Sequence, residues 1–178
     1  EQGTGKQVMA YMIERFRAWF EDEAIAAEVF KSVSALGLSR PLDIQRRVHA
    51  VAGFTRLPQA AALAAANKRV SNILAKLEDA HEFGEVNTNL LQEAQETALS
   101  DALDAVATEV QGHLAEDDYG AALTAMAVLQ EPVDAFFDGV MVNADDDALR
   151  NNRLNLLKAL RDLFLQVADI SQLVVSSK

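Results

Sequence analysis

Cationic and amide side chains at helical spacing carry the clearest chemical signal in the sequence. Projected at about 100° per residue, residues 58–80 place an apolar side, with Leu63 and Val70, opposite a polar side. The polar side carries Lys68, Arg69, Asn72 and Lys76. Residues 41–54 repeat the pattern, with Arg46 and Arg47 projected outward. Lys and Arg contact phosphates and Asn reads base edges, so these two stripes predict a nucleic-acid surface.

The order of charges along the chain supports that interpretation although the net charge is -11. Seven Lys and Arg residues and one acid, Asp43, lie between residues 40 and 76, whereas 18 Asp and Glu residues and no cation lie between residues 78 and 147. A solvated helix surface usually mixes both signs through i,i+4 pairs. The acid-poor segment therefore favours anion binding, and we expect the acidic stretch to lie away from the anion.

The last predicted helix carries a second short basic segment, with four cations and no acid from residue 150 to residue 161. Arg150 and Arg161 share one flank of this helix, and Arg153 lies between them in the chain. For Arg150 and Arg161, two interpretations stay open at this point. They pair with the acidic stretch, or they contact phosphate.

Catalytic patterns are incomplete wherever they occur. The sequence contains no Cys, which excludes thiolate chemistry and disulfides. Residues 3–6 lack the spacing of a phosphate-binding loop. Glu78 and His81 have the spacing of a di-iron motif but have no second copy, and Glu109 with His113 is a lone i,i+4 pair. We expect no catalysis, metal site or cofactor in this chain.

Helix formers dominate and Gly and Pro are scarce, so we expect an all-α bundle of roughly six to eight helices. The expected helices are 8–22, 25–36, 41–54, 58–80, 90–115, 119–130, a short one from residue 132, and one from residues 145–147 to 172. The expected core includes Val70, Ile73, Leu149, Leu156, Leu160 and Val167.

Residues 1–178 form one expected region, with basic-faced helices in 1–80 and the remaining helices in 90–178. No apolar run reaches the roughly 18 residues of a membrane span, so a membrane partner is not expected. The chain begins with Glu1 rather than Met, which suggests a piece of a longer protein.

Three long segments resemble the β subunit of bacterial glycyl-tRNA synthetase. They are residues 54–74, FTRLPQAAALAAANKRVSNIL, residues 133–143, VDAFFDGVMVN, and residues 152–170 near the chain's end. Residues 147–150 also spell DALR, the letters that name that family's helical anticodon-binding domain. The similarity covers nearly the whole chain and is loosest from residue 81 to residue 118.

The resemblance implies a division of labour that the composition does not reveal. It implies a bundle of the DALR anticodon-binding type within a cytoplasmic enzyme of two α and two β subunits. The α subunit would use ATP and magnesium to activate glycine, and the β subunit would hold tRNA-Gly. The candidate tRNA-binding residues are Arg46, Arg47, Arg56, Asn67, Lys68, Arg69, Asn72, Lys76, Arg150 and Arg153. DNA is not an expected partner.

Two alternatives remain. One is the corresponding domain of arginyl-tRNA synthetase, which the segment around Asn67 disfavours. The other is a helical protein-interaction module, in which the acidic stretch docks a basic partner and the basic stripes are merely solvated.

Overall fold

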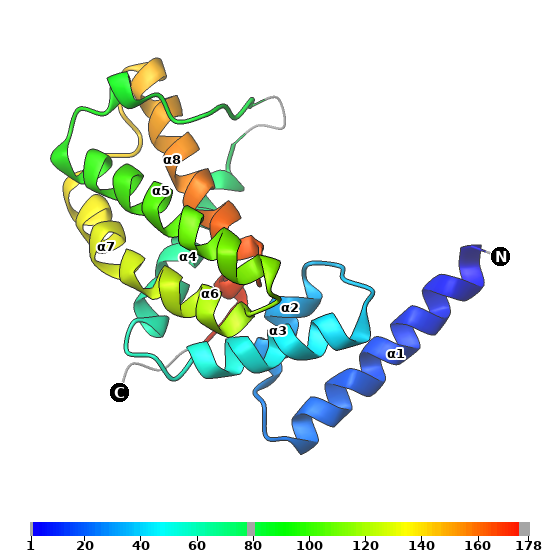
Figure 1. Ribbon diagram of the computed structural model, residues 1–178. Helices are drawn as coiled ribbons and strands as arrows, with labels where there is room; N and C mark the ends of the chain where they lie inside the picture. The colour runs from blue at the N-terminus through cyan, green and yellow to red at the C-terminus, as the bar shows by residue number, and fades with distance from the viewer. Residues whose placement is uncertain (1, 78–80, 175–178) are drawn as a thin grey trace.

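The computed structural model describes residues 2–77 and 81–174, and the regular elements of this part of the chain are all helices, without a strand. Figure 1 shows the arrangement. The α-helices are α1 (Gln2–Asp22), α2 (Ala27–Ser34), α3 (Pro41–Phe54), α4 (Ala60–Leu74), α5 (Ala94–Ala115), α6 (Tyr119–Met126), α7 (Gln130–Gly139) and α8 (Asp147–Leu165). Three short 3-10 turns complete it: Thr88–Leu90, Ala127–Leu129 and Ile170–Gln172. The predicted all-α fold is confirmed.

The body of the molecule is built around one apolar core. Helix α4 packs against α7 and α8, and α5 packs against α6, α7 and α8 (Figure 1). The largest fully buried side chains include Leu63, Leu99, Phe136, Leu156 and Leu160. These come from α4, α5, α7 and α8, so the apolar stripes of four helices meet in the same interior.

Five of the six predicted core residues are buried, namely Val70, Leu149, Leu156, Leu160 and Val167. Ile73 is only half-buried. It packs against the core with one side and faces a surface groove with the other.

Local interactions explain where two helices differ from their predicted bounds. Helix α5 begins at Ala94 rather than near residue 90, because Glu93 and Glu96 form a capping box. Helix α8 ends at Leu165 rather than near residue 172. The chain turns there, and the backbone N–H of Asp169 donates to the carbonyl of Ser32 at 2.8 Å.

Helix α4 begins at Ala60, and after Leu74 only a turn continues to residue 77. The predicted end of this helix near residue 80, and the Glu78 of the di-iron spacing, lie outside the described residues. Residues 3–6, whose glycines faintly suggest a phosphate loop, belong to helix α1.

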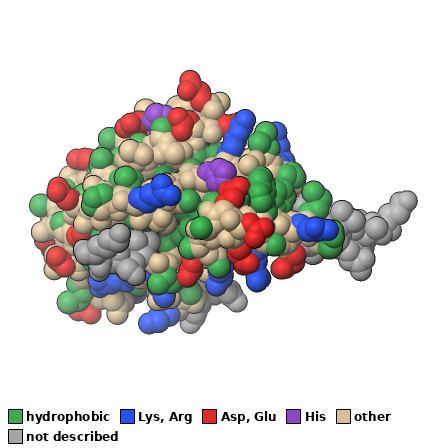
Figure 2. All heavy atoms as spheres, turned by 90° about the horizontal axis from the view of Figure 1, so that it is seen from below, with side chains coloured by type: hydrophobic (Ala, Val, Ile, Leu, Met, Phe, Trp, Pro, Cys, Tyr) green, Lys and Arg blue, Asp and Glu red, His purple; other side chains and the backbone are tan. Residues whose placement is uncertain are grey.

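Helix α1 leaves the body as an arm (Figure 1). Near its carboxyl end, Phe20 is buried, with ring centroids 5.8 Å from Phe30 and 5.9 Å from His49. Further out, Tyr11 and Met12 are exposed. Figure 2 shows apolar side chains gathered where the arm leaves the body. None of the described helices combines the length and apolar character needed to cross a membrane.

Candidate nucleic-acid interface

A groove of about 610 Å³ opens between the end of α4, the connection from α7 to α8, and the first turns of α8. Its lining comprises Arg69, Ile73, Lys76, Leu77, Val140, Met141, Val142, Asn143, Arg150 and Leu154. Three cations and an amide therefore share a groove whose other walls are apolar. No carboxylate is among these lining residues.

The sequence of α4 determines which side chains reach the groove. Arg69 and Ile73 stand one turn apart on the same face, and Lys76 follows in the turn that ends the helix. Val70 points to the opposite side and is fully buried, which fixes the rotation of the helix. The cations also lie near the carboxyl end of α4, where the helix dipole favours positive charge.

Lys68 and Asn72 are exposed on a neighbouring row of α4, at i and i+4, and this row also leads toward Lys76. Neither side chain has a hydrogen-bond or ion-pair partner within residues 2–77 and 81–174. The predicted polar side of this helix is therefore accessible to a ligand, as is Arg56 in the turn that precedes it.

Arg150 lines the groove but is held by its own surroundings. Its guanidinium donates to the carbonyl of Ala144 at 2.7 Å and forms an ion pair with Asp147. Of the two open interpretations for Arg150, the structure shows pairing with the acidic stretch. Among the described residues, Arg69 and Lys76 are then the groove cations without a carboxylate partner.

Arg153 was expected on the tRNA surface, but the structure corrects this prediction. Its side chain is only 5% exposed, and its guanidinium lies 2.9 Å from the carboxylate of Glu96, which is fully buried. It also donates to the carbonyl of Met141 at 2.7 Å. Arg153 therefore links the loop at Met141 to Glu96 of α5 through buried contacts. A phosphate cannot reach its guanidinium.

The Glu96 carboxylate has several donors. Besides Arg153, it accepts hydrogen bonds from the backbone N–H groups of Gln92 at 3.0 Å and Glu93 at 2.8 Å. Burial alone raises the pKa of this carboxyl, but the hydrogen bonds from Arg153 and the two N–H groups outweigh burial and leave the pKa below its ordinary value. The carboxylate is thus charged and fully partnered at neutral pH.

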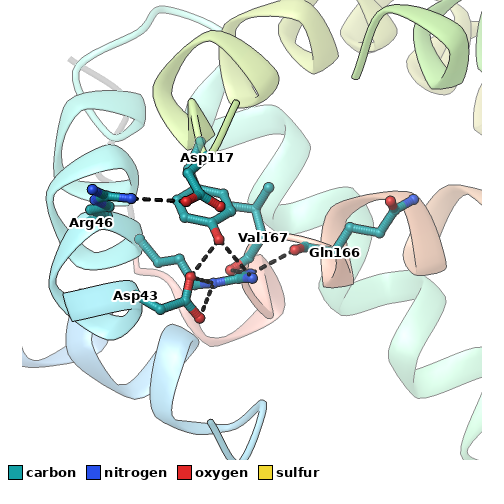
Figure 3. A network of polar contacts seen from close by, with 7 residues as sticks. Asp43, Arg46, Asp117, Gln166 and Val167 are labelled. Atoms are coloured by element: carbon teal, nitrogen blue, oxygen red, sulfur yellow. Dashed lines mark hydrogen bonds and ion pairs between the residues drawn. The ribbon is translucent and has the colours of Figure 1, made fainter. Parts of the chain in front are cut away.

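Arg47 is a second correction, because its side chain turns inward rather than outward. The guanidinium donates to the carbonyls of Gln166 at 2.6 Å and Val167 at 3.0 Å, and it pairs with Asp43 at 3.2 Å. It also lies over the ring of Tyr119, 4.2 Å from the centroid. Figure 3 shows this network. Arg47 thereby joins α3 to α6 and to the end of α8.

Tyr119 reinforces the network around Arg47. Burial, followed by the hydrogen bond that its hydroxyl donates to Asp43, raises the pKa of the Tyr119 phenol. The phenol therefore stays protonated and remains a donor. Arg46, the neighbour of Arg47 in the chain, does point outward, where it pairs with Asp117 at 2.9 Å.

We expect Arg47→Ala to lower the free energy of unfolding by about 2 kcal/mol, since it leaves Asp43 and two carbonyls without their donor. Arg46→Ala is the matched control and should cost less than about 1 kcal/mol, because its ion pair is exposed. Urea unfolding of both variants measures the difference. Equal effects would contradict a structural role for Arg47.

Asn67 is the third correction. It is 2% exposed, and its Nδ2 donates to the carbonyl of Leu63 one turn earlier at 3.0 Å. The buried Nδ2 group is thus used within α4, and the side chain is not available to a base.

The predicted residues do not gather at one site. Arg46 and Arg47 lie beside Asp117 and Tyr119 at the turn between α5 and α6, whereas Arg69 and the other groove residues lie beside the α7–α8 connection. The ion pair of Arg46 also shows that the acidic stretch supplies a partner to the basic one.

Sequence reasoning missed the wall opposite α4. Residues 140–143 fall within the acidic stretch that was expected to lie away from the ligand, yet they line the groove with Arg69. They contain no acid themselves. The available signal was the apolar run from residue 140 to residue 142, directly after Gly139, followed by the amide of Asn143.

Comparisons with known proteins place the chain in a family. Residues 63–171 match the family described as the DALR anticodon binding domain. The chain is 53% identical over 174 residues to the glycine–tRNA ligase beta subunit of Marinobacter nauticus, an alignment that covers 97% of this chain and 25% of that protein. The beta subunit of Actinobacillus pleuropneumoniae is 54% identical over 166 residues, covering 93% of this chain and 24% of that protein. The chain thus spans about a quarter of the length of these relatives.

Proposed function

The chain belongs to the family of DALR anticodon binding domains, and from that premise we propose that it holds the anticodon end of tRNA-Gly as part of a glycine–tRNA ligase beta subunit. Its role would be to bind and recognise the tRNA, while the attachment of glycine takes place elsewhere in the enzyme. The incomplete catalytic patterns of this sequence are compatible with that division.

The groove beside α4 is the observation that carries the proposal. Sequence-specific proteins recognise RNA mostly through unstacked loop bases, which need apolar or planar surfaces for their faces and polar groups for their edges. The groove offers apolar walls, the Asn143 amide and two cations, Arg69 and Lys76, that have no carboxylate partner within the described residues. An anticodon loop presents bases and phosphates in the same small volume.

The wider assembly is part of the same proposal. The partner would be the alpha subunit of the ligase, in a complex of two alpha and two beta subunits in the cytoplasm. ATP and magnesium would bind to the alpha subunit, so nucleotide binding would be a property of the whole enzyme. The relatives' names support glycine rather than arginine as the amino acid.

The proposal predicts tRNA binding that depends both on the anticodon and on salt. We expect the intact protein to bind tRNA-Gly roughly tenfold or more tightly than the same tRNA with a replaced anticodon. The logarithm of affinity should fall with the logarithm of salt concentration, by about 0.7 to 0.9 per phosphate contact. Filter binding across a salt series measures both quantities.

A protein-interaction module would behave differently. It would bind both tRNAs equally weakly, with a slope near zero, because its cations would only be solvated. That outcome would refute the proposed function.

A further inference from the structure

The guanidinium of Arg69 lies over the aromatic ring of Phe137 beside the groove. Its Cζ atom lies 4.2 Å from the centroid of the Phe137 ring. Phe137 in turn contacts Phe136 in an edge-to-face arrangement, with 5.7 Å between ring centroids, and Phe136 is fully buried. Phe136 thus joins the ring beneath the Arg69 guanidinium to the core.

The other face of the Arg69 guanidinium has no polar partner in the part of the chain that the structure describes. Arg69 is exposed, and within the described residues its guanidinium makes neither a hydrogen bond nor an ion pair. A guanidinium that is backed on one face offers the other to a second flat group, and Arg planes are among the surfaces on which unstacked RNA bases lie.

The remaining walls fit a base better than a bare phosphate. Ile73, Val140, Val142 and Leu154 offer no hydrogen bonds, and Met141, which is 74% exposed, adds a polarisable side chain. Phosphate would lose its hydration against such walls without compensation. The face of a base loses little there, and its edge can reach the amide of Asn143.

The loop that carries these residues is fixed in position. Arg153 donates to the carbonyl of Met141 and is itself held by Glu96. The wall opposite Arg69 is therefore set before any ligand binds, which reduces the ordering cost of binding.

We propose that the groove takes one unstacked RNA base, which stacks on the free face of Arg69 while Lys76 contacts an adjacent phosphate. The inference rests on the proposed function and deepens it, because it assigns the base-binding element within the domain. It also gives the two cations different roles, because Arg69 would stack on a base through its planar guanidinium and Lys76 would contact a phosphate through its charge.

The test uses Arg69→Lys, which keeps the charge and removes the plane. The probe is the anticodon stem-loop of tRNA-Gly with 2-aminopurine at each loop position in turn, bound to the intact protein. We expect one position to change its fluorescence through stacking, and Arg69→Lys to abolish that change. Affinity should fall on the order of tenfold with an unchanged salt slope. Phe137→Leu, which removes the backing ring, should give a smaller loss of the same kind.

The matched control is Lys76→Ala, which should lower the salt slope by about 0.7 to 0.9 and leave the fluorescence change in place. Wild-type affinity and fluorescence in Arg69→Lys, with normal binding of tRNA-Gly, would overturn the stacking inference alone. A protein that does not bind tRNA-Gly at any salt concentration would overturn the proposed function as well. Circular dichroism of each variant confirms that the helices are intact.

Discussion

Reversing the charge of two groove cations, with Arg69→Glu and Lys76→Glu, should lower the affinity of the intact protein for tRNA-Gly at least about 20-fold at 0.15 M salt. On the counterion-release scale, the phosphate contact of Lys76 is worth about fivefold at that concentration. The base stacked on Arg69 is worth on the order of tenfold, so the two losses together exceed about 20-fold. Repulsion from the two introduced carboxylates adds to the effect. Filter binding and glycylation by the complete enzyme measure the loss.

The control for this double variant is Lys31→Glu with Arg40→Glu, which changes the net charge equally but lies outside the groove. We expect its affinity to fall less than about threefold, because neither side chain lines the groove and exposed charges outside a contact are largely screened by salt. Equal losses in the two double variants would show that only the overall charge matters, and the groove would then have no special role.

Arg153→Ala should lower the free energy of unfolding by about 3 to 5 kcal/mol, the largest stability effect that we expect for a single substitution in this chain. The reason is that Glu96 would remain buried and charged, without its guanidinium partner. Urea or thermal unfolding measures the change. A loss below about 1 kcal/mol would mean that water or another donor replaces the guanidinium.

The pH dependence of the free energy of unfolding tests the Arg153–Glu96 ion pair independently. The pKa of Glu96 is lowered in the folded protein, so the unfolded chain binds the proton more readily. The stabilisation is therefore present above the unfolded pKa of about 4.3 and is lost as the pH falls through the folded value. In Arg153→Ala this acid-dependent part should shrink, and the curve of stability against pH should flatten below about pH 4.

A double variant separates the stability contributed by the Arg153–Glu96 ion pair from that contributed by the capping box of α5. Glu96→Gln with Arg153→Met removes both charges and should recover much of the lost stability, since an uncharged interior has no unpaired ion. The amide of Gln can still accept from the N–H of Glu93, so the start of α5 remains capped. If the double variant recovered none of the lost stability, the packing of Arg153 rather than its charge would be what stabilises the fold.

Helical periodicity predicted the fold well because it reports the direction in which each Cβ leaves its helix. The polar face of α4 and the buried face with Leu63 and Val70 follow from it. Asn67 could have been assigned correctly on the same grounds, since it stands one turn after Leu63 on the buried side.

Arg153 and Arg47 show where helical periodicity cannot predict the direction of a side chain. A long guanidinium side chain can bend back from a boundary position toward any acceptor within reach. The partner of Arg153 is Glu96, 57 residues earlier in the chain, and Arg47 finds carbonyls of Gln166 and Val167 about 120 residues later. Only the assembled fold brings such partners together, so spacing within one helix could not reveal them.

The projecting helix α1 has a mechanical consequence. A straight helix rises about 1.5 Å per residue, so the 18 residues between Gln2 and Phe20 span about 27 Å beyond the packed ring of Phe20. A pivot of about 10° at that ring would displace the far end of the arm by about 5 Å, whereas residues beside the ring would move by a fraction of an ångström. A small repacking of Phe20 against Phe30 and His49 would therefore produce a displacement that grows along α1 toward its amino-terminal end.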